Sequence, residues 1–84
     1  MKIDEDSLTS ANATRVLEAG LAAIRGGDLE IDLSRVGRCD SSAVALLLAW
    51  RREARARRVT VTFDGVPADL KSLAALYGVD TLIA

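Results

Sequence analysis

The fold is decided by residues 38–58, RCDSSAVALLLAWRREARARR, which join a helix start, an apolar middle and a cationic end. Asp40 or Ser41 suits the N-cap, where a side-chain oxygen accepts a hydrogen bond from an amide of the first turn. Residues 43–50 are all apolar, and alanine and leucine are strong helix formers. The arginines that follow favour the negative end of a helix dipole. The stretch therefore predicts one long helix.

At about 100° per residue, this helix separates large side chains from small ones. The large side chains form the predicted core face: Val44, Leu46, Leu47, Leu48 and Trp50. The small ones share the opposite face with one arginine: Ser41, Ser42, Ala45, Ala49 and Arg52. An ordinary solvated face carries Lys, Glu or Gln instead. Two interpretations stay open, namely a smooth docking surface for another protein and simple exposed alanine.

Composition bounds the class of protein. The chain has 84 residues and a formal net charge of −1, so we expect one small domain with no general affinity for nucleic acid or anionic membranes. A single cysteine excludes an internal disulfide and suits a reducing compartment. Histidine is absent, which removes the usual general base and the commonest metal ligand. The N-terminus has no apolar signal segment, and we expect a cytoplasmic protein.

Shorter elements flank the long helix. A helix is predicted from a cap at Ser10 or Asn12 to about Arg25, with an apolar side made of Ala13, Val16, Leu17, Gly20 and Ile24. Alternating patterns predict strands at 28–34 and 58–63, with the connection 35–39 as a loop. A third helix begins near Pro67, with its apolar side made of Val66, Leu70, Leu73 and Tyr77. Residues 2–4 form a weak candidate strand, and residues 79–84 form a last short strand or an apolar tail.

The order of these elements, (β)αβαβα(β), is typical of an α/β fold with a mainly parallel sheet. Strands covered on both faces are continuously apolar, whereas these two alternate. We therefore expect helices on one face of a small sheet and a polar, partly open opposite face.

The chemistry of a typical enzyme is missing from the sequence. The phosphate-binding patterns GxxxxGK and GxGxxG are absent, and Ser41 has no histidine to activate it. We therefore predict no catalytic residues, no metal ligands and no cofactor. Cys39 is interpreted as a small buried filler. The arginine cluster is interpreted first as a solvated helix end, then as a contact for an acidic partner, and last as a nucleic-acid site.

Residues 31–79 resemble STAS domains, the fold of anti-sigma factor antagonists and of the cytosolic tails of SulP anion transporters. The resemblance rests on DLSRVGRCDSSAVALLL at 32–48 and LAALYGV at 73–79, and covers roughly three-quarters of the chain. Within the family, the stretch is most similar to the MlaB branch, the STAS subunits of Mla phospholipid transporters. The usual glycine after the Asp-Ser-Ser triplet is Ala43 here, and the N-terminal strand region of this single STAS domain, 1–84, is shortened.

The resemblance implies a non-enzymatic subunit that binds the MlaF-like ABC ATPase at the cytoplasmic face of the inner membrane and supports phospholipid transport and outer-membrane lipid asymmetry. No direct membrane insertion is expected. The partner-binding or regulatory residues are then predicted to be Asp40, Ser41, Ser42, Ala45, Ala49 and Arg52. In the alternative branch, Ser41 is the phosphorylated residue of an anti-sigma factor antagonist. A third class is a STAS module that binds a small molecule or nucleotide.

Overall fold

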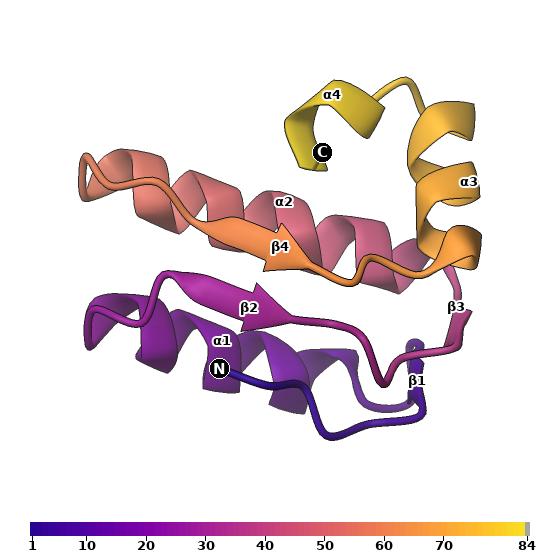
Figure 1. Cartoon of the computed structure of the whole chain (residues 1–84), viewed down its shortest axis with the longest axis horizontal. Coiled ribbons are helices and arrows are strands. Elements are labelled where there is room, and N and C mark those ends of the chain that lie inside the picture. Colours follow the sequence, from indigo (N-terminus) through magenta and orange to yellow (C-terminus); the bar gives the residue numbers. More distant parts are fainter. Residues whose placement is uncertain (84) are drawn as a thin grey trace.

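The computed structural model describes residues 1–83 and has the α/β organisation that the sequence predicts (Figure 1). Its elements follow in the order β1 (Ser7–Leu8), α1 (Ala13–Arg25), β2 (Glu30–Asp32), β3 (Arg38–Cys39), α2 (Ser41–Ala56), β4 (Thr62–Asp64), α3 (Ala68–Leu76) and α4 (Asp80–Ile83). The longest of these elements, α2, is the helix predicted from residues 38–58.

Helix α2 starts where its sequence predicts. Asp40 is the N-cap residue in extended conformation, and its carboxylate accepts a hydrogen bond from the Ser42 amide at 2.8 Å. The bond satisfies one of the amides that the first turn leaves without an intrahelical partner. The predicted core face is confirmed except at one position: Val44, Leu46, Leu47 and Trp50 are buried, whereas Leu48 is half-buried.

The sheet is smaller than predicted and is divided in two. Strands β2 and β4 pair in parallel, with Ile31 opposite Phe63, and β1 pairs in parallel with β3. The candidate strand at residues 2–4 is reduced to one parallel bridge between Lys2 and Asp32. The prediction of a loop at 35–39 was wrong at its C-terminal end, because Arg38–Cys39 form β3. A two-residue strand has too few residues to show a period of two, so pattern analysis cannot detect it.

Helices α1 and α2 lie on one face of the β2–β4 ladder, as predicted (Figure 1). Figure 1 shows both strands in front of α1 and α2. On the helix side, Ile31 and Leu33 are fully buried, whereas Glu30 and Thr62, which pair across the ladder, are exposed on the other side. The alternation of the two strands therefore reports one-sided coverage correctly.

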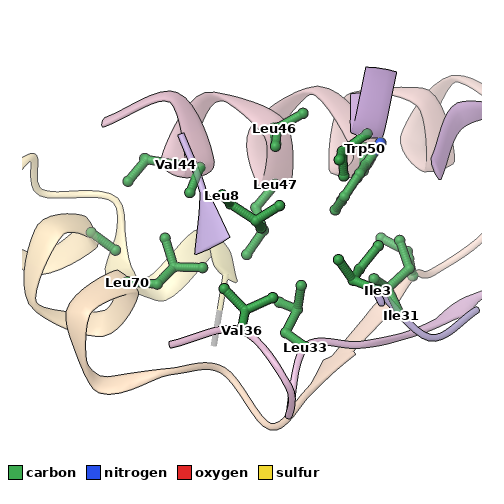
Figure 2. Packing of buried hydrophobic residues seen from close by; sticks show 14 of the residues in the cluster. Ile3, Leu8, Ile31, Leu33, Val36, Val44, Leu46, Leu47, Trp50 and Leu70 are labelled. Atoms are coloured by element: carbon green, nitrogen blue, oxygen red, sulfur yellow. The ribbon is translucent and has the colours of Figure 1, made fainter. Parts of the chain in front are cut away.

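The core lies between α2 and the strands (Figure 2). Its largest fully buried side chains come from five parts of the chain: Trp50, Leu8, Ile31, Leu33, Leu47 and Leu70. The Trp50 indole packs against Gly20 of α1, and its Nε1 donates a hydrogen bond to the Leu17 carbonyl at 3.1 Å. Gly20 therefore marks close packing of α1 against the Trp50 side chain of α2.

The strand predicted at 58–63 begins later than expected, because its first residues belong to the C-terminal cap of α2. The Arg58 amide donates to the Arg55 carbonyl and the Val59 amide donates to the Ala54 carbonyl, and Arg58 has a φ of 59°. These bonds define a Schellman cap. Val59, on the apolar side of the strand predicted at 58–63, is instead 37% exposed, and β4 spans Thr62–Asp64.

The C-terminal predictions were wrong in two respects. Tyr77, placed on the core face of the third helix, is 56% exposed, because α3 ends at Leu76 and Gly78, at φ 72°, turns the chain away. Val79 is half-buried against the core, and the strand or tail expected after it is the short helix α4, which contacts α2. Ala84, the last residue of that expected segment, lies outside the described residues.

Candidate partner-binding site

Asp40 connects two parts of the chain at the start of α2. One carboxylate oxygen accepts from the Ser42 amide at 2.8 Å, and the other accepts from the Ser10 amide, before α1, at 3.1 Å. These amide hydrogen bonds, led by the one from Ser10, hold the pKa of Asp40 below its ordinary value. The Asp40 carboxylate therefore caps α2 and also links the start of α2 to the segment before α1.

The two serines after Asp40 differ in accessibility. Ser41 is the first residue of α2 and is exposed, whereas Ser42 is half-buried and gives its amide to Asp40. An exposed hydroxyl at the first turn of a helix is accessible to a kinase or to a partner. A phosphate there would meet the positive helix end but also the neighbouring carboxylate.

The small side chains of α2 line a shallow groove beside α1. Ser42, Ala45 and Ala49 form one wall, and the other wall is formed by Ala13, Thr14 and Leu17 of α1. The groove has a volume of about 260 Å³, and Ala45, which is exposed, is accessible from solvent. Helix α1 therefore covers part of the predicted small-residue face of α2 and leaves Ala45, at its centre, open.

Arg52 does not line this groove. It is exposed and borders a second hollow, together with Leu48, Arg51, Arg55 and Ala56 of α2. The predicted site residues therefore fall into three places along one helix: the cap with Ser41, the groove with Ala45, and the arginine-lined hollow.

The contribution of α1 to the groove was not predicted from the sequence. Thr14 is exposed and lies next to the predicted core positions of α1, so nothing in its own spacing distinguishes it from a solvated residue. The only available signal was Gly20, which marks the level at which α1 and α2 approach each other closely.

Cys39, interpreted as a buried filler, is half-buried just before the cap. Burial, with a smaller contribution from the negative charge of Asp69, raises the pKa of its thiol. The thiolate that nucleophilic or redox chemistry requires is thus disfavoured.

Residues 1–83 contain no cluster of three or more His, Cys, Asp or Glu side chains placed to hold a metal ion. Among the helices within these residues, none has the length and apolar character needed to cross a membrane.

Comparison with known proteins gives one family. A family model described as "Mlab, STAS domain" matches residues 5–84. The match includes the whole of α2, the Asp40 cap and the groove beside α1. No curated protein matches the chain.

Proposed function

The chain belongs to the STAS domain family, in its MlaB type, and on this basis we propose that it is the STAS subunit that binds the ATPase of an Mla-type ABC transporter. STAS domains are generally non-catalytic binding domains. In the proposed role the chain has no catalytic residues and no cofactor, and it supports the ATPase during phospholipid transport that maintains outer-membrane lipid asymmetry. The complex holds it at the cytoplasmic face of the inner membrane.

The observation that carries this proposal is the open groove of small side chains between α1 and α2. Ala45 and Ala49 carry only a methyl group, so the backbone of a partner helix can approach α2 closely. Apolar side chains such as Leu17 supply contact area in the groove, and Ser41 and Arg52 are exposed on the same side of α2 and can bind polar groups at the rim. An apolar centre with a polar rim is the usual anatomy of a protein interface.

The experiment is co-purification of the chain with a tagged MlaF-type ATPase, using Ala45→Glu as the test variant. A glutamate there places a charge and a long side chain in the groove, and we expect binding to weaken by about tenfold or more, because an unpaired charge would be buried. Ala22→Glu is the matched control, since Ala22 is an exposed helical alanine of α1 that does not line the groove. Both variants change the net charge equally.

The prediction also states what must not change. Far-UV circular dichroism and Trp50 fluorescence of Ala45→Glu should match the unmodified protein, because Ala45 is exposed. If the folded Ala45→Glu variant still retains the ATPase as well as the Ala22→Glu control does, the groove is not the docking surface.

Exposure of the Ser41 hydroxyl favours a second candidate, an anti-sigma factor antagonist that is switched by phosphorylation at Ser41. Incubation with ATP and a GHKL-type serine kinase, followed by mass measurement, tests it. This candidate requires a phosphate that disappears in Ser41→Ala and persists in Ser42→Ala. A chain that co-purifies with the ATPase and stays unmodified by the kinase supports the transporter role instead.

A further inference from the structure

We propose that the arginine surface, defined as Arg51, Arg52, Arg55 and Arg58, docks an acidic helical segment of a protein partner. All four side chains lie in the second half of α2 or in the turn that follows it. The proposal goes beyond the ATPase contact in the groove, since it assigns a second surface and a different chemistry.

Some arginines of α2 and its end are paired with a carboxylate and others are not. Glu53, the acidic residue of α2, is shared by two cations: Arg25 of α1 at 3.2 Å and Arg57 at 3.0 Å. The hydrogen bond from Arg25, supported by Arg57, lowers the pKa of Glu53. Within residues 1–83, no carboxylate forms an ion pair with any of the four arginines of the arginine surface.

Local helix stability does not account for all of these arginines. Stabilisation by the helix dipole falls off within the last turn, and Arg51 and Arg52 precede the last turn of a helix that ends at Ala56. Arg51 and Arg55 are also spaced i, i+4, where like charges disfavour the helix. The dipole therefore does not explain Arg51 and Arg52.

Arg58 lies in the turn that directly follows α2, next to these arginines in sequence. It occupies the left-handed position of the Schellman cap, at φ 59°, where L side chains are strained. Helices α1 and α3 have glycine at the equivalent position, Gly27 and Gly78. The chain thus keeps an arginine where its own two other caps use the residue that carries no strain.

The shape of the surface indicates what kind of molecule it fits. Two hollows, of about 580 and about 270 Å³, share Arg51 and Arg55 as a common wall. The remaining linings are largely apolar side chains: Leu48 and Ala56 in the first hollow, and Ala54, Val59 and Val61 in the second. Guanidinium groups over apolar linings match an amphipathic segment that has both carboxylates and apolar side chains.

Charge and geometry favour acidic protein over the other anions. Guanidinium groups bind carboxylates through two parallel hydrogen bonds, and Arg51 and Arg55 stand one helical turn apart, like Glu residues at i and i+4 of a partner helix. Single-stranded nucleic acid requires exposed aromatic platforms, and Trp50, the aromatic residue of α2, is fully buried. A membrane surface favours apolar side chains that can insert, and Val59 is the one large exposed apolar side chain lining these hollows.

The test measures binding of a fluorescein-labelled helical peptide to the full chain by fluorescence anisotropy. The peptide has about 18 residues, enough to hold a helix in water, with Glu at i, i+4 spacing along a leucine stripe. The test variant is Arg51→Gln with Arg55→Gln. The matched control is Arg38→Gln with Lys71→Gln, which changes the net charge equally at two exposed cations outside the arginine surface. Arg52 is left unchanged because it also belongs to the proposed ATPase site.

The expected result is binding that weakens by about tenfold or more in the test variant and stays within about twofold in the control. Added salt should weaken binding to the unmodified protein, because the exposed charges are screened. Arg55→Lys, which keeps the charge and loses the planar fork, should fall between the two. If the double variant misfolds by circular dichroism, Arg55→Gln alone decides, since Arg55 is exposed and its loss should weaken binding several-fold.

Several outcomes would overturn the proposal. They are an absence of binding, an equal loss in the Arg38/Lys71 control, and equal binding of a peptide in which every Glu is Gln. Tighter binding of phosphatidylglycerol vesicles or of single-stranded DNA than of the peptide, lost in the test variant, would overturn the choice of occupant. Retention of the ATPase by the same test variant is expected in every case, so failure here leaves the proposed transporter role standing.

Discussion

At the scale of single residues, the contact between Gly20 and Trp50 sets how closely the two long helices approach. A Cβ atom on Gly20 would overlap the Trp50 indole. The indole is fully buried and donates its hydrogen bond to the Leu17 carbonyl, so it cannot move aside without losing that bond. Packing of the indole therefore requires glycine here, despite the conformational cost of glycine in a helix.

Gly20→Ala is expected to destabilise the protein by about 1–3 kcal/mol, as overpacking of a well-packed core does. The measurement is urea unfolding followed by fluorescence of Trp50, the single tryptophan of the chain. Gly26→Ala is the matched control, because Gly26 has a φ of −83° and its added Cβ would meet neighbours at 3.4 Å or more. Equal stability of the two variants would contradict the packing argument.

Asp40 is expected to make stability depend on pH. Its pKa is lowered in the folded protein, so its contribution is present above the ordinary value of 3.8 and is lost as the pH falls through the folded pKa. Asp40→Asn removes the charge, and the variant should be less stable at neutral pH. The difference in unfolding free energy between the two proteins should shrink as the pH falls to about 2. Asp28, Asp32 and Glu53, which also have lowered pKa values, titrate equally in both proteins and cancel. If the difference in unfolding free energy stayed constant with pH, the Asp40 carboxylate would not be the group responsible.

Arg58→Gly is expected to raise the unfolding free energy by about 1 kcal/mol, because it relieves the left-handed strain at the end of α2. Arg58→Ala keeps the strain and removes only the guanidinium, so it should change stability by less than about 0.5 kcal/mol. Thermal unfolding by circular dichroism separates the two. A loss of stability in Arg58→Gly would show that the side chain itself holds the turn.

At the scale of elements, α3 shows how a helix can have apolar residues on both sides. Leu70 and Ala74 are fully buried against the core, whereas Leu76 is 77% exposed at the end of the same helix. Leu70→Ala should therefore cost about 2–5 kcal/mol in unfolding free energy, and Leu76→Ala should stay within about 0.5 kcal/mol. Denaturant unfolding of the two variants gives the comparison. A comparable cost for Leu76→Ala would indicate that the end of α3 packs differently.

Helix α2 packs against the core on one side and contributes to two separate surface hollows on its other sides. Its large side chains fill the core, its small ones form the groove beside α1, and its arginines line the hollows near its end. One helix can do this because its side chains point in all directions around the axis, about 100° apart.

At the scale of the whole molecule, we propose that residues 1–84 form a single STAS domain. Buried residues from both halves of the chain, including Ile31 and Leu70, belong to one core cluster. Unfolding should therefore be a single cooperative transition, with coincident curves from far-UV circular dichroism and Trp50 fluorescence. Two separated transitions would contradict the single domain.

Much of the fold could be predicted because the decisive patterns are local. The cap at Asp40, the arc of large side chains in α2 and the alternation around Ile31 all lie within a few residues of sequence, and the structure confirms them. Two of the errors, at Val59 and Tyr77, occur where the end of a helix competes with the predicted continuation of an element. Val59 fits the alternating pattern of a strand, but its amide donates a hydrogen bond to the Ala54 carbonyl in the Schellman cap of α2.

The candidate site could be predicted in composition and not in shape. Spacing around α2 places Ser41, Ala45 and Arg52 on one face of a helix, and all three are exposed in the structure. The spacing does not indicate that Thr14 of α1 and Ala45 line the same groove, because that depends on where the two helices cross.

The sequence by itself determined the class of fold, the long helix, its cap and the family, because these follow from bonds and periodicities between near neighbours in the chain. Only the tertiary structure decided the pairing of β1 with β3, the partial cover of the small-residue face by α1, and the separation of the paired arginines from the arginine surface. Each of these joins residues that are distant in sequence. Such contacts form when the free energy gained by burying surface exceeds the entropic cost of closing the chain between them. That balance depends on several segments together and cannot be predicted from any one of them.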